Sequence, residues 1–178
     1  MIRKQNEKGF SLIELLIVVA IILIIAAIAI PNLLRARMAA NESSAVGSVR
    51  TLTTANVTYS STWGNGFAPT IAVLGGVPGG NATCNAALLI DNTLAATGQK
   101  SGYKLSYAMG SPNAIAAPTC GAAGGNAFAF TALPINPGTT GQSGFCAAED
   151  GVVRRDPTGT AMVAGQPDTV CVPFAPLQ

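Results

Sequence analysis

The hydrophobic positions of this chain are concentrated in one uninterrupted run near the N-terminus. Between Phe10 and Ile30, Glu14 is the only charged residue. A helix of this length spans about 31 Å, which matches the hydrocarbon core of a bilayer. The run is apolar on every side, which predicts a helix that faces lipid or packs against other apolar helices. An acidic residue inside a membrane is costly, so the position of Glu14 indicates a specific role.

The helical pattern continues beyond this run in a different form. Pro31 is expected to kink the helix rather than end it, because residues 32–61 still have helical periodicity. A narrow apolar stripe recurs every seven residues and is formed by Met38, Ala45, Leu52 and Tyr59, with Val46 beside it. Two polar residues, Glu42 and Asn56, interrupt the stripe. Other polar residues lie elsewhere on the helix, namely Arg35, Asn41, Ser48 and Thr54. We expect this amphipathic part to pack on a globular domain, and the helix to end at Trp63-Gly64.

After the long helix the pattern changes to short strands and glycine-rich loops. Residues 67–98 are expected to be mainly loop, with a short helix over 86–96. Alternating or compact apolar segments predict strands, at residues 102–109, 127–133, 144–148 and 152–155. The dipeptide Asp150-Gly151 predicts a hairpin between the last two strands. The prediction is an α+β fold in which a small antiparallel sheet of three or four strands packs on the long helix, followed by a coil-like tail held by Cys171.

The charge of the chain is uneven along its length. The formal net charge is +2, and it comes from the first nine residues, where Arg3, Lys4 and Lys8 outnumber Glu7. Such a basic flank is typical of the end of a membrane helix that stays in the cytoplasm. Basic and acidic residues balance from Phe10 onward, which leaves no basic stripe of the kind that binds nucleic acid.

The four cysteines lie after the apolar run, and their spacing favours disulfides. None forms a C-x-x-C pair, and the chain contains no histidine, so a zinc site of four scattered thiols is the less favoured alternative. An even number of cysteines in an exported domain is typical of disulfides. Of the three possible connectivities, we favour Cys84–Cys120 and Cys146–Cys171, because sequential pairing closes the shortest loops.

The sequence offers little support for catalysis or for a cofactor. Without histidine there is no Ser-His or Cys-His nucleophile and no histidine metal ligand. Glu149, Asp150 and Asp156 are close enough in sequence to suggest calcium, but the rim of a hairpin turn explains them equally well. We therefore expect no enzyme activity, no cofactor and no metal site.

A secretory signal peptide is the main alternative for the N-terminal run. The basic start and Ala27-Ile28-Ala29, which resembles a cleavage site, agree with it. However, the apolar region is longer than the usual 7–15 residues and contains an acid. We therefore favour a retained helix.

The segment Gly9-Phe10-Ser11-Leu12-Ile13-Glu14-Leu15-Leu16 resembles the processing signature of type IV pilins and the related pseudopilins. The shared pattern is a short basic leader that ends in glycine, then phenylalanine, then an acid four residues further on within a long apolar helix. Pro31 matches as well, and the specific resemblance extends from residue 3 to about residue 40. The expected fold is therefore the pilin fold.

The resemblance implies how the N-terminus is processed and what Glu14 does. In the family, a membrane peptidase that is also a methyltransferase cuts after the residue matching Gly9 and methylates the new amino terminus, here Phe10. The matching acid, Glu14, then neutralises the Phe10 amine of a neighbouring subunit during assembly. Physical chemistry supports this role, because an unpaired ammonium is costly in an apolar filament core. Phe10, Glu14 and Pro31 are thus the expected assembly residues.

The resulting interpretation is a structural subunit of a type IV pilus. It divides the chain into a leader (1–9), a membrane and filament-core helix (10–31), an amphipathic helix (32–61) and a globular head (62–178). The subunit is expected in the inner membrane with a cytoplasmic N-terminus, and then in an extracellular homopolymer used for adhesion, motility or DNA uptake. Further partners that the resemblance implies are an inner-membrane assembly platform and an outer-membrane secretin. A pseudopilin of a type II secretion system and a monomeric membrane-anchored binding domain are the alternatives.

Overall fold

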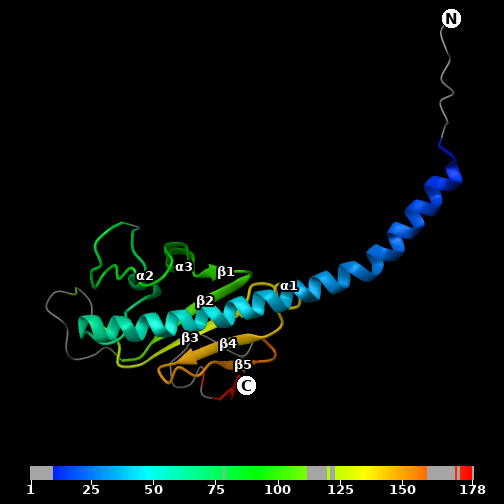
Figure 1. Ribbon diagram of the computed structural model, residues 1–178. Helices are drawn as coiled ribbons and strands as arrows, with labels where there is room; N and C mark the ends of the chain where they lie inside the picture. Colours follow the sequence, from blue (N-terminus) through cyan, green and yellow to red (C-terminus); the bar gives the residue numbers. More distant parts are fainter. Residues whose placement is uncertain are drawn as a thin grey trace, which may run out of the picture. The chain divides into compact units, whose positions relative to one another are not determined.

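In the computed structural model, one long helix, α1, runs from Leu12 to Trp63 and is followed by short helices and a sheet (Figure 1). The structure describes residues 10–77, 79–111, 120, 123–159, 171 and 173–177. The chain divides into two units, Met1–Arg37 and Met38–Gln178, and α1 contributes to both. The combination of a long apolar helix with an antiparallel sheet confirms the predicted α+β class.

The first unit, where the structure describes it, is the N-terminal part of α1. Its large apolar side chains are mostly half or more exposed, for example Ile13 at 64% and Leu23 at 63%. The helix continues through Pro31, as the sequence predicted. In the second unit α1 ends at Trp63, and Gly64 follows with a left-handed φ of 63°. The Gly64 N–H donates to the Ser60 carbonyl at 3.0 Å, which is the expected glycine stop.

The buried face of α1 in the second unit is wider and more polar than the predicted stripe. Ala45, Leu52 and Tyr59 are buried as expected, but so is Ser48, which was placed on another face. Burial of Ser48 is possible because its hydroxyl donates to the Ser44 carbonyl at 2.9 Å, so no donor is left unpaired. Further residues of this face are buried, namely Val49, Thr53, Ala55 and Asn56.

Glu42, which interrupts the apolar stripe, has a structural function in the second unit. Its carboxylate oxygen Oε1 accepts hydrogen bonds from the backbone N–H groups of Gln142 and Ser143, at 2.9 and 3.1 Å. These charge-assisted bonds hold a loop of the sheet against α1. The sequence pattern alone identified Glu42 only as a break in the stripe.

The described strands form one antiparallel sheet of six strands in the order β1-β2-β3-β4-β5-β6, with α1 packed along it (Figure 1). The strands are β1 (Gln99–Lys100), β2 (Tyr103–Met109), β3 (Phe128–Pro134), β4 (Gly144–Ala148), β5 (Arg154–Asp156) and β6 (Ala175–Pro176). Strands β2 to β4 agree with the prediction. The predicted number of strands was wrong, because the two-residue edge strands β1 and β6 carry too few residues to show an alternating pattern.

The hairpin between β4 and β5 is present, but its last strand starts later than predicted. The backbone N–H of Val152 donates to the Asp150 carboxylate at 3.0 Å and so belongs to the turn. Strand β5 therefore begins at Arg154, which pairs with Cys146, rather than at Val152. This local turn is an Asx-type arrangement that competes with strand pairing.

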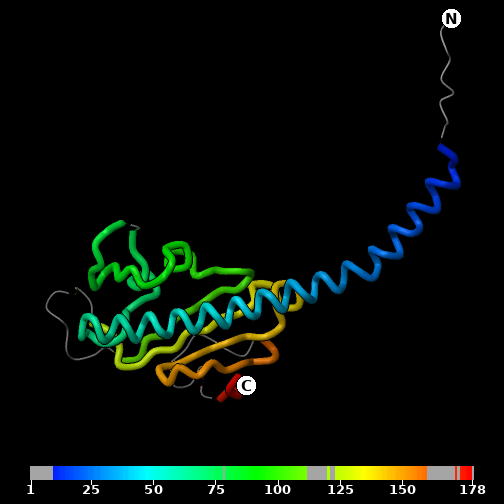
Figure 2. Tube along the Cα trace, in the orientation of Figure 1, coloured from blue at the N-terminus to red at the C-terminus, as the bar shows by residue number. Residues whose placement is uncertain are grey.

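The connection between α1 and the sheet, traced in Figure 2, differs most from the prediction. It contains a short helix α2 (Ile71–Leu74) that was not predicted, and α3 (Asn92–Thr97), which replaces the helix expected over 86–96. Residues 87–90 donate backbone hydrogen bonds to residues 73–75 instead of to one another. Helix α3 can begin only after them, where Asp91 caps it by accepting the Leu94 N–H at 3.1 Å.

A polar cluster joins α1 to this connection and to β2. The buried Asn56 side chain accepts the Ala68 N–H at 2.8 Å and donates to the Tyr107 hydroxyl at 3.4 Å. Tyr107 in turn donates to the Ala68 carbonyl. Burial raises the pKa of Tyr107 to about 12, although the hydrogen bond from Asn56 lowers it, and burial also raises the pKa values of Tyr59 and Tyr103.

These tyrosines predict a loss of stability at alkaline pH. The unfolded chain loses its phenolic protons near pH 10, whereas Tyr107 in the folded chain keeps its proton until about pH 12. The folded state therefore binds more protons, and stability falls as the pH rises from about 10 towards about 12. We expect tyrosinate absorbance to appear together with the loss of circular dichroism. Tyrosinate formation with a midpoint near 10 in a chain that stays folded would contradict the burial argument.

Candidate processing and assembly site

The first residues that the structure describes lie just ahead of α1. Gly9, the predicted cleavage residue, is outside the described residues. Phe10 is 84% exposed, and the helix begins two residues later at Leu12. The peptide bond before Phe10 is therefore followed by a non-helical residue with an accessible side chain.

Glu14 has a partner within its own chain that sequence reasoning missed. Its carboxylate oxygen Oε2 accepts the backbone N–H of Ser11 at 3.1 Å. Ser11-Leu12-Ile13-Glu14 matches the capping-box pattern S-x-x-E, in which the acid at the third helical position satisfies a backbone donor at the helix start. The carboxylate also lies at the positive end of the helix dipole. Glu14 thus stabilises the start of α1 in a single subunit, and the pattern was visible in the sequence.

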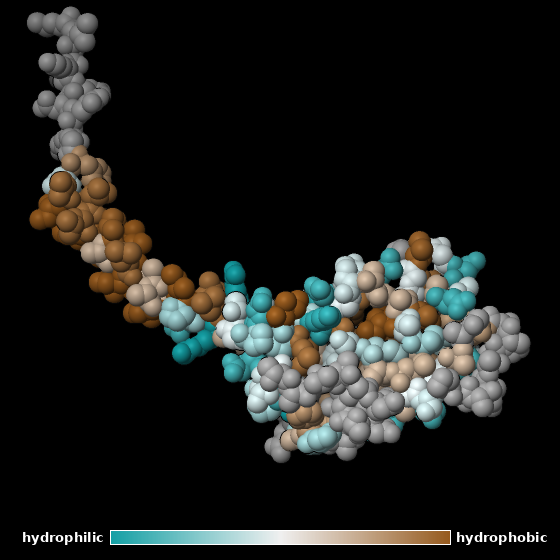
Figure 3. Space-filling model, turned by 180° about the vertical axis from the view of Figure 1, so that it is seen from behind, coloured by the Kyte–Doolittle hydropathy of each residue, from teal (hydrophilic) through white to brown (hydrophobic). Residues whose placement is uncertain are grey.

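The part of α1 that follows Glu14 has an apolar surface, which no other described segment of the same chain covers. Side chains between Leu12 and Leu34 account for most of the exposed large hydrophobic residues. They form the continuous brown surface of the exposed helix in Figure 3. Among the residues that the structure describes, α1 is the one helix that is long and apolar enough to cross a membrane. A cleavable signal sequence meets the same criterion, so length and hydropathy do not decide between the two.

The structure pairs Cys84 with Cys120 and Cys146 with Cys171, the connectivity that the shortest-loop argument favours. Their Cα atoms are 5.6 and 5.7 Å apart, within the normal range for disulfides. Cys146 is central in the sheet, and both it and Cys171 are fully buried. This disulfide therefore connects β4 to the C-terminal segment.

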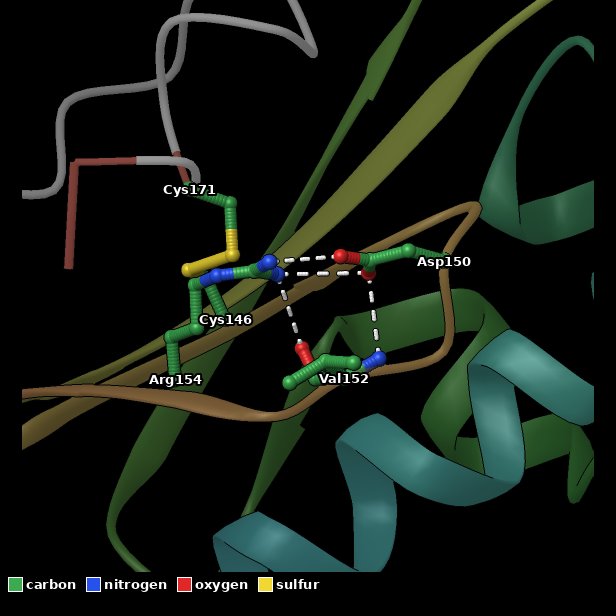
Figure 4. The surroundings of a disulfide bond; sticks show 5 residues. All are labelled: Cys146, Asp150, Val152, Arg154 and Cys171. Atoms are coloured by element: carbon green, nitrogen blue, oxygen red, sulfur yellow. Dashed lines mark hydrogen bonds and ion pairs between the residues drawn. A yellow bond between two sulfur atoms is a disulfide. The ribbon is translucent and has the colours of Figure 1, made fainter. Parts of the chain in front are cut away.

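An ion pair lies beside the Cys146–Cys171 disulfide (Figure 4). Arg154 donates to both oxygens of Asp150, at 3.2 and 2.5 Å, and this bonding holds the pKa of the Asp150 carboxyl below its usual range. Because the pair is partly exposed, its contribution to stability is small. It fixes the shape of the β4–β5 turn.

The three acids considered as calcium ligands do not converge. Asp150 is bonded to Arg154, whereas Glu149 accepts the Phe128 N–H at 3.3 Å. Asp156 accepts from the backbone and the hydroxyl of Thr158. Among the described residues, no group of three or more potential metal ligands occurs.

The described geometry defines a protein with an exposed apolar N-terminal helix, capped by an acid, and a disulfide-bonded α+β unit. A family model named prokaryotic N-terminal methylation motif matches residues 4–30. The chain therefore carries the N-terminal methylation motif of prokaryotic pilins, as its sequence predicted.

A curated relative extends this result. The type IV wide pilus major component PilA4 of Thermus thermophilus is 67% identical over 39 residues. The match covers 22% of this chain and 30% of PilA4, so the chain spans less than a third of the length of the relative that it matches. No solved structure matches the chain. The N-terminal segment is thus similar to that of a type IV pilin, and the comparisons do not extend over the α+β unit.

Proposed function

We propose that this chain is a structural subunit of a type IV pilus. It is cut after Gly9, methylated at Phe10 and polymerised through the N-terminal part of α1 into an extracellular filament. The observation that carries this proposal is the methylation motif on a helix whose apolar side chains lack a cover in the single chain. In the bilayer, lipid covers this surface. Outside it, copies of the same helix are the simplest cover of matching length and hydropathy.

The charges at the head of the helix explain how the copies find their register. Cleavage after Gly9 creates an ammonium at Phe10, next to an apolar surface. Glu14 lies one helical turn further on, so it can meet the Phe10 amine of a neighbour that is displaced along the helix axis. Pairing removes the cost of burying either charge alone, and it favours one axial offset over others.

The proposal includes the location and the partners of the subunit. Before assembly the subunit is an inner-membrane protein whose basic N-terminus is cytoplasmic, where a prepilin peptidase and methyltransferase acts on it. An inner-membrane platform and an outer-membrane secretin then support assembly and passage of the filament. Pro31 kinks the helix within the filament core. The subunit has a structural rather than a catalytic role.

Sheared surface fibres test this function. We expect them to consist mainly of this chain, and their N-terminal peptide to begin with Phe10 and to carry one additional methyl group by mass spectrometry. An unprocessed chain in the membrane would indicate a monomeric anchor, and a new N-terminus after Ala29 would indicate a signal peptide. Processed chain that stays in the periplasm would favour a pseudopilin of a type II secretion system. Loss of adhesion, twitching or DNA uptake on deletion would show which task the filament serves.

A further inference from the structure

We propose that Arg35 and Arg37 bind the phosphate groups of anionic lipids at the outer face of the membrane and anchor the processed subunit there before assembly. The inference rests on the membrane-inserted stage of the proposed function. It concerns the first unit alone, because both arginines precede its boundary at Met38.

The arginines lie directly beyond the apolar surface. Leu33 and Leu34 are the last large apolar residues of the exposed helix, at 54% and 49% exposure, and both arginine side chains that follow are exposed. Leu12 to Leu34 span about 33 Å along a helix, roughly one hydrocarbon core. A helix inserted with Leu12 at the inner boundary therefore places the arginines at the depth of the outer headgroups. Long basic side chains at this depth reach the phosphate layer.

Neither arginine has a protein partner in the described chain. No hydrogen bond or ion pair of the described residues involves the guanidinium of Arg35 or of Arg37. Two carboxylates precede and follow them on α1. Glu14 is about 30 Å away along the helix, and Glu42 accepts the backbone N–H groups of Gln142 and Ser143. Two guanidinium groups in this position are therefore available to an external anion, and planar guanidinium groups match phosphate geometry well.

The spacing of the two arginines favours a lipid surface over a protein. Residues two positions apart on a helix project about 200° apart around its axis. A neighbouring helix contacts one side only and would reach one of the two. Lipid headgroups surround the helix on all sides and can bind both at once.

Processing gives this pair its significance. Before cleavage, Arg3, Lys4 and Lys8 attach the helix to the inner face of the membrane, and Arg35 and Arg37 attach it to the outer face. Removal of residues 1–9 takes away the basic side chains at the inner face. It leaves the Phe10 ammonium and the Glu14 carboxylate there, whose charges are opposite, and Arg35 and Arg37 at the outer face. The cleaved helix is then anchored at the outer face, the side towards which it must leave, and no Lys or Arg side chain has to cross the bilayer.

Spin-labelled lipids measure the anchoring directly. The processed, full-length chain is reconstituted in phosphatidylcholine vesicles, and the association of spin-labelled phosphatidylglycerol is compared with that of spin-labelled phosphatidylcholine. Each basic residue near an anionic surface contributes about a fivefold preference. We expect the processed chain to prefer phosphatidylglycerol, and R35Q/R37Q to lower this preference at least fivefold. High salt should weaken it as well.

R50Q is the matched control, because Arg50 is also exposed on α1 but belongs to the second unit, and its substitution should leave the preference unchanged. Glutamine keeps a high helix propensity, so the variants should fold normally. An unchanged preference in R35Q/R37Q would overturn the inference. The inference would also be overturned if R35Q/R37Q changed only the association between copies of the chain in neutral vesicles. That result would indicate that the arginines bind a carboxylate of another copy rather than lipid phosphate. Absence of motionally restricted lipid of either kind would instead contradict the membrane stage of the proposed function.

Discussion

We expect replacement of Glu14 by alanine to abolish or severely reduce surface fibres and to leave the chain in the membrane. The reason is that each subunit would bury the Phe10 ammonium without a partner, at a cost of about 3–5 kcal/mol. This cost weakens each addition step by about two to four orders of magnitude. Loss of one acid makes the apolar helix no less hydrophobic, so insertion should persist. Counting sheared fibres and measuring the membrane-bound chain in the same cells tests both parts.

The capping box requires a second variant, because alanine also removes the hydrogen bond from Ser11 to Glu14. Glutamine retains an acceptor at this position and caps helices in the same pattern, but it has no charge. If assembly depends on the charge pair, E14Q loses fibres as completely as E14A. E42Q is a suitable control, since it removes an acid from the same helix and preserves an acceptor for the Gln142 and Ser143 amides. Normal fibres from E14Q would show that Glu14 acts only as a cap.

We expect removal of the Cys146–Cys171 disulfide by the double substitution C146A/C171A to lower the stability of the second unit by about 3–4 kcal/mol. The disulfide closes a loop with a sequence separation of 25 residues, and its loss increases the conformational freedom of the unfolded chain. For a unit of this size the melting temperature should fall by about 10 °C. The remaining contacts of β4 with β3 and β5 do not replace a covalent link to the C-terminal segment.

Thermal unfolding followed by circular dichroism, with and without reductant, measures this effect. V152A, an exposed substitution in the neighbouring turn, should change the melting temperature little. A shift of less than about 3 °C in C146A/C171A would contradict the expected contribution. Non-reducing peptide mapping that joined Cys84 to Cys146 or Cys171 would contradict the connectivity itself.

Much of the candidate site was predictable because its chemistry is local. The apolar run, the acid within it and the Gly9-Phe10 junction are adjacent in sequence, so a short segment contains the whole predicted processing signal. The capping bond between Ser11 and Glu14 was equally local, and its S-x-x-E pattern could have been recognised. The glycine stop after Trp63 and the central strands β2, β3 and β4 were also local, since each is long enough to show its own periodicity.

The remaining features depended on partners far away in the sequence. Burial of Asn56 and the contacts of Glu42 become favourable only when loops and strands from the rest of the unit provide donors and acceptors. The Ser48 hydroxyl has a local partner in the Ser44 carbonyl, but Ser48 is buried only because the rest of the unit packs against this face of α1. The edge strands β1 and β6 exist because neighbouring strands offer unpaired backbone groups. Backbone bonding to residues 73–75 likewise delays the start of α3.

By itself, the sequence determined the apolar helix and its C-terminal end, and it predicts the residues of the processing junction, because hydrophobic periodicity and helix-terminal chemistry act over a few residues. The tertiary structure decided which polar residues of α1 are buried, how many strands the sheet has and where α3 and β5 begin. The physical reason is that packing and hydrogen-bond partners from distant segments decide these features. Asn56 is bonded to Ala68 and Tyr107, and residues 87–90 are bonded to residues 73–75.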